Sequence, residues 1–533
     1  MIELRGLTFS YDDSSTPVLD GVDLILEDGE FVVVAGRTGV GKSTLLGTFN
    51  GLVPQFTGGT LTGDVLIDSE SVICAPPRER AYAVGYVGQD PDAGFVTDTV
   101  EEELAYGMEQ LGLEPATMRR RVEETLDLLG LADLRDRDLS SLSAGQQQRV
   151  AIGSVLAMHP RLLVLDEPTS ALDSTSAEDV LATLMRLAHD VGITVLIAEH
   201  RLERVIPFAD RLCLVEEGGT LRVGLPADVL RHAAVVPPIV ALGLLAQWEP
   251  LPLSVREARR QARNWDVALP EPAVESASKP SEGGRRVVEA SGLTVTHGRR
   301  VALRDVDLVL HAGEVTALMG RNGSGKSTLL WTLQGSRRRV DGSLSVAGVD
   351  PATIPSAQRR AHVGLVPQTA ADLLYLETVA EECAAADEET GATKRSCRVL
   401  LDELAPGVPG HRHPRDLSEG QRLALVLAIV LTAGPGVVLL DEPTRGLDYP
   451  GKAALARTLS RLAAEGRAVL VATHDVEFVA EVARRVVVLA DGEVVSSGPT
   501  ALVVAETPAF APQVLKILGP GWLTVDQVTA AIR

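Results

Sequence analysis

The chain of 533 residues is too long for a single hydrophobic core, and its 45% hydrophobic and 23% charged residues exclude a largely disordered protein. A formal net charge of −22 without a long basic run argues against a nucleic-acid partner. No stretch reaches the roughly 18 to 20 apolar residues of a membrane-spanning helix, and the N-terminus lacks a signal-peptide pattern, so we expect a cytosolic chain.

The first chemical motif is a glycine-rich loop after an apolar strand. EFVVVAG is predicted to form a buried strand, and GRTGVGKST at 36–44 a loop that opens a helix. Glycines at this spacing let backbone N–H groups face a polyphosphate, and the helix N-terminus favours negative charge. We predict that Lys42 contacts the β- and γ-phosphates and that Ser43 binds Mg²⁺. The other predicted nucleotide-binding residues of this loop are Gly36, Gly39, Gly41 and Thr44.

A later apolar strand in the same half ends in two acidic residues. RLLVLDEP places Asp166 at the end of the strand and Glu167 directly after it. Phosphoryl transfer needs a carboxylate that holds the metal and a group that orients the attacking water. We therefore assign Asp166 to the metal and Glu167 to the general base. Such a pair alone could be an ordinary acidic turn, and the upstream phosphate loop favours the catalytic interpretation.

The same motifs recur in the same order in the second half, which indicates a tandem duplication. GRNGSGKST at 320–328 repeats the phosphate loop, and VVLLDEP ends in Asp441 for the metal and Glu442 for the base. The predicted residues of the second loop are Gly320, Asn322, Gly323, Gly325, Lys326, Ser327 and Thr328, with Ser327 as the metal ligand. Apolar strands that alternate with helical segments predict α/β domains, each with a mostly parallel sheet.

The domain organisation follows from the repeat and from composition. The segment LPEPAVESASKPSEGG is rich in Pro, Ser, Gly and Glu, which is typical of a flexible connector. Each half also ends with prolines, an apolar helix-like stretch and a turn, which we interpret as a small appendage. The predicted divisions are a first domain at 1–232, an appendage at 233–264, a linker at 265–284, a second domain at 285–505 and a C-terminal appendage at 506–533.

The loops LSAGQ at 142–146 and LSEGQ at 417–421 separate this sequence from other P-loop proteins. With them the chain resembles the ATP-binding-cassette (ABC) ATPases over nearly all of its length. The resemblance implies ATP hydrolysis with Mg²⁺, and cassettes that add an antiparallel β subdomain and a helical signature subdomain to the sheet. In that family the signature loop of one cassette covers the γ-phosphate on the phosphate loop of the other, so head-to-tail pairing within this chain is expected.

The resemblance also groups the residues into two composite sites. The first would combine Lys42, Asp166, Glu167 and His200 with Ser418 and Gly420, and the second Lys326, Asp441, Glu442 and His474 with Ser143 and Gly145. Gln421 and Gln146 of the same signature loops are further predicted ATP-binding residues. His200 and His474 match the switch histidine near the γ-phosphate. Gln89 and Gln368 match the glutamine loop, which touches nucleotide, metal and water.

One more family position differs between the halves. Tyr11 matches the aromatic residue that stacks on adenine, whereas His297 stands where an aromatic residue is usual in the second half. An imidazole stacks more weakly than a phenol ring, so the resemblance implies weaker nucleotide binding there. Both halves keep the catalytic glutamate and histidine, and two active sites are expected.

The run DPDAGFVTDTVEEELAYGMEQLGL at 90–113 is more specific. It resembles the energy-coupling-factor ATPases, which drive uptake of vitamins and transition-metal ions, although its pattern also fits an ordinary amphipathic surface helix. The resemblance implies a peripheral ATPase at the cytoplasmic face of the membrane, with a transmembrane scaffold and a substrate-binding membrane subunit as partners. Two alternatives stay open: the fused ATPase of a sugar importer, and a soluble tandem ABC protein that remodels ribosomes or nucleic acid.

Overall fold

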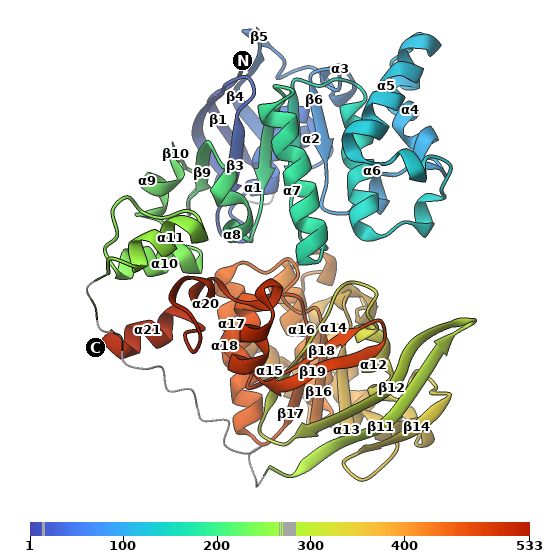
Figure 1. Ribbon diagram of the computed structural model, residues 1–533. Coiled ribbons are helices and arrows are strands. Elements are labelled where there is room, and N and C mark those ends of the chain that lie inside the picture. Colours follow the sequence, from blue (N-terminus) through green and yellow to red (C-terminus); the bar gives the residue numbers. More distant parts are fainter. Residues whose placement is uncertain (13–15, 266, 268, 270–283, 533) are drawn as a thin grey trace. The chain divides into compact units, whose positions relative to one another are not determined.

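A computed structural model describes residues 1–12, 16–265, 267, 269 and 284–532 (Figure 1). Contacts within the chain divide it into two compact units, Met1–Glu257 and Ala258–Arg533, which are described separately below. The predicted linker at 265–284 lies almost wholly outside the described residues, and the other predicted domain limits stay predictions. In the described part of the chain, every helix is too short or too polar to span a bilayer.

The strands of unit 1 form two sheets. They are β1 (Ile2–Ser10), β2 (Leu19–Leu26), β3 (Phe31–Ala35), β4 (Thr60–Ile67), β5 (Glu70–Ser71), β6 (Val84–Val87), β7 (Leu162–Asp166), β8 (Thr194–Ala198), β9 (Arg211–Val215) and β10 (Leu221–Gly224). The first sheet is antiparallel, in the order β2-β1-β4-β5. The second has the order β10-β9-β3-β8-β7-β6 and is parallel except at its edge strand β10.

The helices of the first half cover the larger sheet and add a separate group beside it. They are α1 (Lys42–Asn50), α2 (Leu52–Gln55), α3 (Pro77–Arg80), α4 (Val100–Gln110), α5 (Pro115–Leu129), α6 (Ala144–Leu156), α7 (Ser174–His189), α8 (Leu202–Val205), α9 (Pro226–Leu230), α10 (Pro238–Leu245) and α11 (Val255–Ala262). Strands β3, β7 and β8 are buried along their whole length, as expected for a parallel sheet with both faces covered. Helices α4, α5 and α6 form the separate group (Figure 1).

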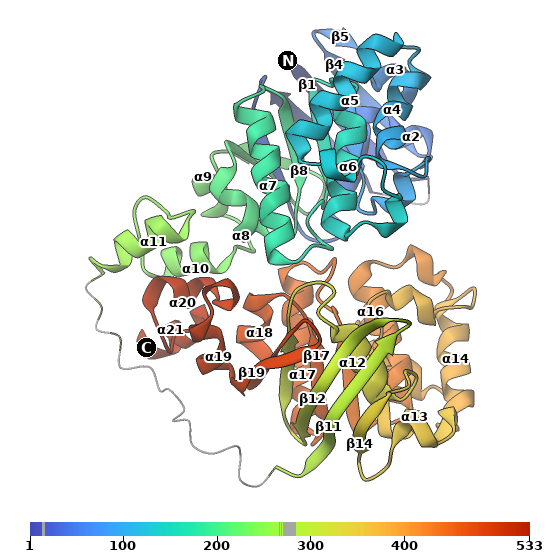
Figure 2. The same cartoon turned by 45° about the vertical axis from the view of Figure 1, so that its right-hand side comes forward.

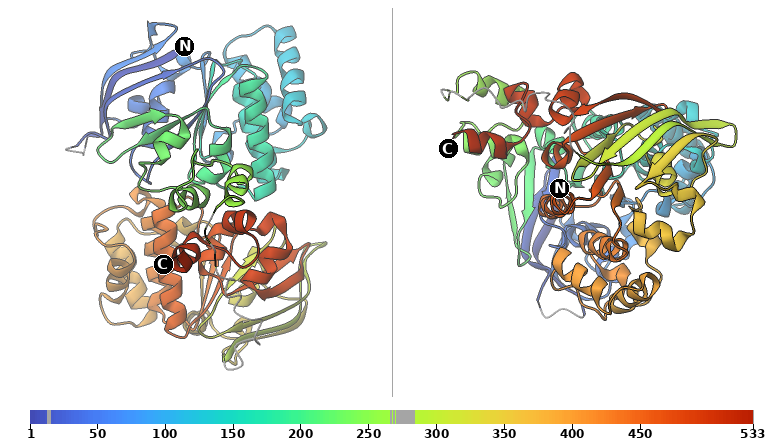
Figure 3. Two further views of the ribbon diagram at one scale, coloured as in Figure 1. Left: turned by 60° about the vertical axis from the view of Figure 1, so that its left-hand side comes forward. Right: turned by 90° about the horizontal axis from the view of Figure 1, so that it is seen from below.

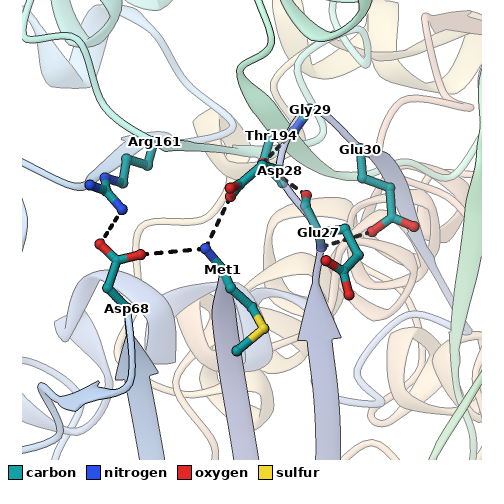
Figure 4. A network of polar contacts seen from close by, with 8 residues as sticks. All are labelled: Met1, Glu27, Asp28, Gly29, Glu30, Asp68, Arg161 and Thr194. Carbon is teal, nitrogen blue, oxygen red and sulfur yellow. Dashed lines mark hydrogen bonds and ion pairs between the residues drawn. The ribbon is translucent and has the colours of Figure 1, made fainter.

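A polar network connects the two sheets of unit 1 (Figure 4). The amino group of Met1, at the start of β1, lies 3.0 Å from Asp28 Oδ1 and 3.5 Å from Asp68 Oδ1. Arg161, just before β7, also pairs with Asp68. At the start of β8 the Thr194 hydroxyl accepts from Gly29 N at 3.0 Å. The ion pairs are solvent-exposed, so each contributes little stability and the network mainly aligns the ends of the strands.

Unit 2 repeats this architecture (Figure 2). Its strands are β11 (Arg286–His297), β12 (Arg300–His311), β13 (Val315–Met319), β14 (Asp341–Val346), β15 (Val363–Val366), β16 (Val437–Asp441), β17 (Ala468–Ala472), β18 (Arg485–Ala490) and β19 (Glu493–Pro499). The antiparallel sheet has the order β12-β11-β14. The larger sheet has the order β15-β16-β17-β13-β18-β19 and is parallel except at β19. Two such units confirm the predicted tandem α/β fold.

The helices of unit 2 include the final helices of the chain, shown in dark red in Figure 3. They are α12 (Lys326–Gln334), α13 (Ser356–His362), α14 (Val379–Thr390), α15 (Ser396–Leu404), α16 (Glu419–Thr432), α17 (Tyr449–Ala464), α18 (Val476–Val482), α19 (Thr500–Glu506), α20 (Gln513–Leu518) and α21 (Val525–Ile532). Val479 of α18 shares an apolar cluster with Leu515 and Leu523. The Gln513 N–H also donates to Glu477 Oε1 at 2.7 Å, so the final helices pack against α18.

Candidate active sites

Each larger sheet carries a glycine loop between a central strand and a helix. In unit 1 the loop joins β3 to α1, and in unit 2 it joins β13 to α12. The residue before each helix, Gly41 or Gly325, has a φ of 107°. A Cβ on Gly41 would lie 2.6 Å from Val18 Cγ1, so only glycine fits this turn. Both predicted phosphate loops therefore adopt the same left-handed entry to a helix.

A buried lysine closes each loop. Lys42 Nζ donates to the carbonyl oxygens of Gly36 at 2.9 Å and Arg37 at 3.0 Å. Lys326 makes the matching bonds, at 2.8 Å and 3.1 Å, to Gly320 and Arg321. Each ammonium group thus lies at a helix N-terminus, where the charge of the lysine and the helix dipole both attract a phosphate.

The acidic residue at the end of each strand lies beside the loop serine. Asp166 accepts a hydrogen bond from the Ser43 hydroxyl, and Asp441 accepts one from Ser327. Burial raises the pKa of both carboxyl groups, and the serine hydrogen bonds oppose that rise. In each carboxylate, Oδ1 is buried without a hydrogen-bond partner among the described residues. Such an unsatisfied acceptor fits a bound cation.

The donor set fits magnesium that arrives with a nucleotide. Nowhere in the described ranges do three His, Cys, Asp or Glu side chains gather as a metal-binding group. Mg²⁺ commonly takes only one or two protein ligands and completes its shell with phosphate oxygens and water. The pairs Ser43 with Asp166 and Ser327 with Asp441 are such two-ligand sets.

The candidate general base contacts the candidate switch histidine in both units. His200 Nε2 lies 2.7 Å from Glu167 Oε1, and His474 Nδ1 lies 2.9 Å from Glu442 Oε2. Glu167 and Glu442 have φ values of 52° and 49°, in the left-handed region that long side chains seldom occupy. Their N–H groups donate to the carbonyl of the last residue of the neighbouring strand, Ala198 or Ala472, at 2.9 Å and 2.8 Å. This bond holds each strained turn in place.

The two sites differ in the residue that precedes the histidine. Glu199, just before His200, is buried and accepts from Thr169 N at 2.9 Å, and burial raises its pKa to about 7. At the equivalent place in unit 2, the hydroxyl groups of Thr473 and Thr444 lie 3.3 Å apart. Glu199 is not among the residues predicted from the sequence, although its position beside the histidine was an available signal.

The two aspartates that we predict to bind the metal have different neighbours as well. The Tyr86 hydroxyl hydrogen-bonds to Asp166, whereas Leu365 stands at the equivalent place in unit 2. Tyr86 is likewise absent from the residues predicted from the sequence. The two predicted metal sites therefore have the same serine–aspartate pair but differ in the hydrogen bonds that orient the aspartate.

The glutamine and signature residues lie at exposed or partly exposed positions, except Gly145, which is buried. Gln89 and Gln368 are exposed and follow strands β6 and β15. Ser143 caps α6 and forms a capping box with Gln146, and Ser418 forms the same box with Gln421 at the start of α16. Gly145 and Gly420 lie in the first turns of these two helices. The pairing of each signature with the other unit's phosphate loop stays a prediction.

A ring stands beside the phosphate-loop threonine in both units. The Tyr11 hydroxyl lies 2.9 Å from Thr44 Oγ1, and His297 Nε2 lies 3.4 Å from Thr328 Oγ1. The Tyr11 ring also packs edge-on against Phe9, with ring centroids 4.8 Å apart. The two rings occupy equivalent places, and their stacking on adenine stays a prediction.

Comparisons with known proteins agree with this geometry. A family model described as "ABC transporter" matches residues 19–170 and 303–445. A putative ABC transporter ATP-binding protein of Streptomyces avermitilis is 54% identical over 100% of both chains. A putative HMP/thiamine import ATP-binding protein of Bacillus subtilis is 31% identical over 95% of this chain and 93% of its own. The archaeal ribosome recycling factor aABCE1, solved with the stalk protein aP1, aligns with a TM-score of 0.59 and 20% identity over 94% of this chain and 91% of its own, which shows the fold alone.

Proposed function

This chain belongs to the ABC transporter family and is an ATPase that uses ATP with Mg²⁺, and on that premise we propose that it drives an energy-coupling-factor importer. The observation that carries the proposal of two working sites is the matching pair of histidine–glutamate contacts, His200 with Glu167 and His474 with Glu442. Each stands beside a phosphate-loop lysine and a buried aspartate. Neither site has lost a catalytic group.

The residues divide the chemistry among themselves. Lys42 and Lys326 bind phosphate oxygens, and the serine–aspartate pairs hold Mg²⁺, which neutralises the charge of the phosphates. Glu167 and Glu442 orient the attacking water and accept its proton. In this proposal the histidines leave their glutamates to contact the γ-phosphate.

The proposal places each signature loop over the other cassette's nucleotide. The N-terminus of α16 with Ser418, Gly420 and Gln421 would close the first site, and that of α6 with Ser143, Gly145 and Gln146 the second. Helix N-termini favour the negative γ-phosphate, so both cassettes are drawn together by ATP and released after hydrolysis. Membrane subunits would convert that motion into transport.

The importer subtype is supported by sequence likeness. The run at 90–113 resembles energy-coupling-factor ATPases, and the Bacillus subtilis relative is named for HMP/thiamine import. We infer a peripheral position at the cytoplasmic face of the membrane, with a transmembrane scaffold and a substrate-binding membrane subunit as partners. The substrate class in this proposal is a vitamin or a transition-metal ion.

Two alternatives are less well supported. Fused sugar-importer ATPases resemble this chain in length, but one of their sites is commonly degenerate, whereas both catalytic sets are present here. A soluble remodelling protein would fit the likeness to aABCE1, yet 20% identity supports only the shared fold. The acidic net charge also disfavours an RNA partner.

The test is affinity purification of the full chain from detergent-solubilised native membranes, followed by mass spectrometry. The proposal expects a polytopic scaffold and a small substrate-binding membrane protein in the recovered complex. Recovery of ribosomes instead would overturn it. Recovery of the membrane subunits of a sugar importer would contradict the energy-coupling-factor subtype but would still support a role in transport.

A further inference from the structure

A buried glutamate occupies the same place in both helical groups. Glu103 lies in the first turn of α4 with 4% of its surface exposed, and Glu382 lies in the first turn of α14 with 6% exposed. A carboxylate this deeply buried requires hydrogen-bond donors around it. In both units those donors come from the segment just before the helix.

In unit 1 one carboxylate oxygen holds this segment. Glu103 Oε2 accepts from Val96 N at 3.0 Å, from Thr97 N at 3.0 Å and from the Thr97 hydroxyl at 2.9 Å. The segment begins at Gln89, so the glutamate fixes the chain between the glutamine loop and α4. Val96 is 61% exposed, although its backbone N–H donates to the buried Glu103.

Unit 2 repeats the arrangement with other residues. Glu382 Oε1 accepts from Tyr375 N at 2.5 Å and from Leu376 N at 2.7 Å. The Tyr375 side chain is 80% exposed. Recurrence of the same contact under different exposed side chains indicates that the backbone position, rather than the side chain above it, is what both cassettes specify.

The helices that carry these glutamates pack against the signature helices. In unit 1 a Cβ on Gly153 of α6 would lie 2.7 Å from Leu104 Cδ2 of α4, so the two helices touch without spare room. In unit 2 Cys383 of α14 shares an apolar cluster with Leu425 of α16. Close-packed helices move together, so a displacement of α4 or α14 reaches the helix that Ser143 or Ser418 begins.

Unit 1 has an additional link. Gln147 Nε2 of α6 donates to Asp92 Oδ1 at 2.6 Å, so the segment after Gln89 also contacts the signature helix directly. Ala371 stands in place of Asp92 in unit 2. In unit 2 the segment contacts the signature helix through apolar residues instead, because Leu374 packs against the cluster that contains Leu425 of α16.

We propose that Glu103 and Glu382 are positioning residues that join the exposed segment after each glutamine loop to the signature helix. A membrane subunit that presses on Val96 or Tyr375 would shift the segment, and the buried carboxylate would pass that shift to α4 or α14. This inference rests on the proposed function, because it requires a membrane partner.

Each glutamate accepts its hydrogen bonds through a single oxygen, and this suggests a discriminating set of variants. All the bonds of each glutamate go to one oxygen, so Gln can replace it while Met, of similar length, lacks an acceptor. Glu103→Met and Glu382→Met therefore remove the link with little change in packing, and Glu103→Gln and Glu382→Gln restore it. Glu102→Met and Glu388→Met, at exposed positions of the same helices, are the matched controls.

The experiment measures ATPase activity in the isolated chain and in the complex recovered from native membranes. The Met variants are expected to lower kcat of the complex about tenfold, the size of a typical coupling effect, with KM for ATP unchanged. The isolated Met variants should keep wild-type kcat and KM, and amide exchange at Val96 and Thr97, or at Tyr375 and Leu376, should become faster. The Gln variants and both controls should behave as wild type.

Several results would overturn the inference. An equal loss of kcat in the isolated chain would mean that the glutamates serve the nucleotide site itself. Full activity of the Met complexes, or failure of Gln to restore it, would show that the carboxylate link transmits nothing. If the wild-type chain recovers no membrane subunits, the proposed function fails and this inference with it, whereas a failure confined to the variants overturns the inference alone.

Discussion

His200 Nε2 lies 2.7 Å from Glu167 Oε1, and the same two residue types meet at 2.9 Å in unit 2. The glutamate sits on a strained turn fixed by the neighbouring strand, so its carboxylate is directed by backbone geometry. The contact brings together the two groups that we propose act at the γ-phosphate, one on the attacking water and one on the phosphate itself.

Glu167→Gln combined with Glu442→Gln should abolish steady-state hydrolysis and leave ATP binding intact. Gln keeps the shape and loses the base, and removal of a general base costs roughly 10² to 10⁴ in rate. Phosphate release and equilibrium binding of a fluorescent ATP analogue measure the two effects. Glu178→Gln, at an exposed position of α7, is the control, and undiminished phosphate release in the double variant would contradict the assignment of the base.

Tyr11→Ala should weaken nucleotide binding at the first phosphate loop, and His297→Tyr should strengthen it at the second. A ring stack contributes about 1 kcal/mol, so each change in Kd is expected to be about fivefold. Tyr11→Phe separates the ring from its hydrogen bond to Thr44 and should bind nearly as well as wild type. Titration with an adenine nucleotide gives the values, and equal weakening by Phe and Ala would point to the hydroxyl instead.

Glu199→Gln should change how the stability of unit 1 depends on pH. The folded pKa of about 7 lies above the unfolded value near 4.3, so the folded state holds a proton that the unfolded state has released. The contribution of Glu199 to stability therefore falls as pH rises from about 4 to 7 and then levels off, a loss of about 4 kcal/mol. The Gln variant should lack that fall.

Urea-induced unfolding, monitored by amide exchange in β8 at several values between pH 5 and pH 8, tests this expectation. Glu178→Gln should follow the wild-type curve. A variant at Glu199 that loses stability with pH as steeply as wild type would show that another group is responsible.

Arg80→Leu should destabilise unit 1. The side chain is 2% exposed, and its guanidinium donates to the carbonyl oxygens of Thr48 at 2.8 Å, Ile73 at 2.9 Å and Ala75 at 3.0 Å. Burial lowers the pKa of this arginine, but removal of the donors leaves several buried carbonyls unsatisfied and costs about 3 kcal/mol. Chemical denaturation measures the loss, with the exposed Arg78→Leu as control, and equal stability of the two variants would contradict the argument.

The sequence predicted those parts of the sites in which chemistry depends on local spacing. A glycine loop brings its own lysine and serine, and a buried strand ends in its own acidic pair, so Lys42 and Asp166 could be identified before the fold was known. The tandem α/β architecture followed from the repeat of these motifs.

Other features depend on contacts between segments that are distant in the sequence, or on residues whose local sequence is ordinary. Nothing in the run VEEEL distinguishes buried Glu103 from exposed Glu102, because helix rotation decides which side chain turns inward. Glu199 directly follows a strand, where polar residues are common, so its sequence position does not show that it is buried. Its burial beside the equally buried Thr169 is seen only in the structure. The ring formed by Lys42 with the loop carbonyls likewise appears only in three dimensions.

The final helices of the chain rest on α18, which begins two residues after His474. Affinity tags and fluorescent fusions are usually attached at a C-terminus on the assumption that it is remote from the chemistry. In this protein a truncation that removes α20 would take away an apolar contact of α18, the helix that begins just after the second histidine. An N-terminal tag would disturb instead the contacts of the Met1 amino group with Asp28 and Asp68, which lie at the exposed ends of strands.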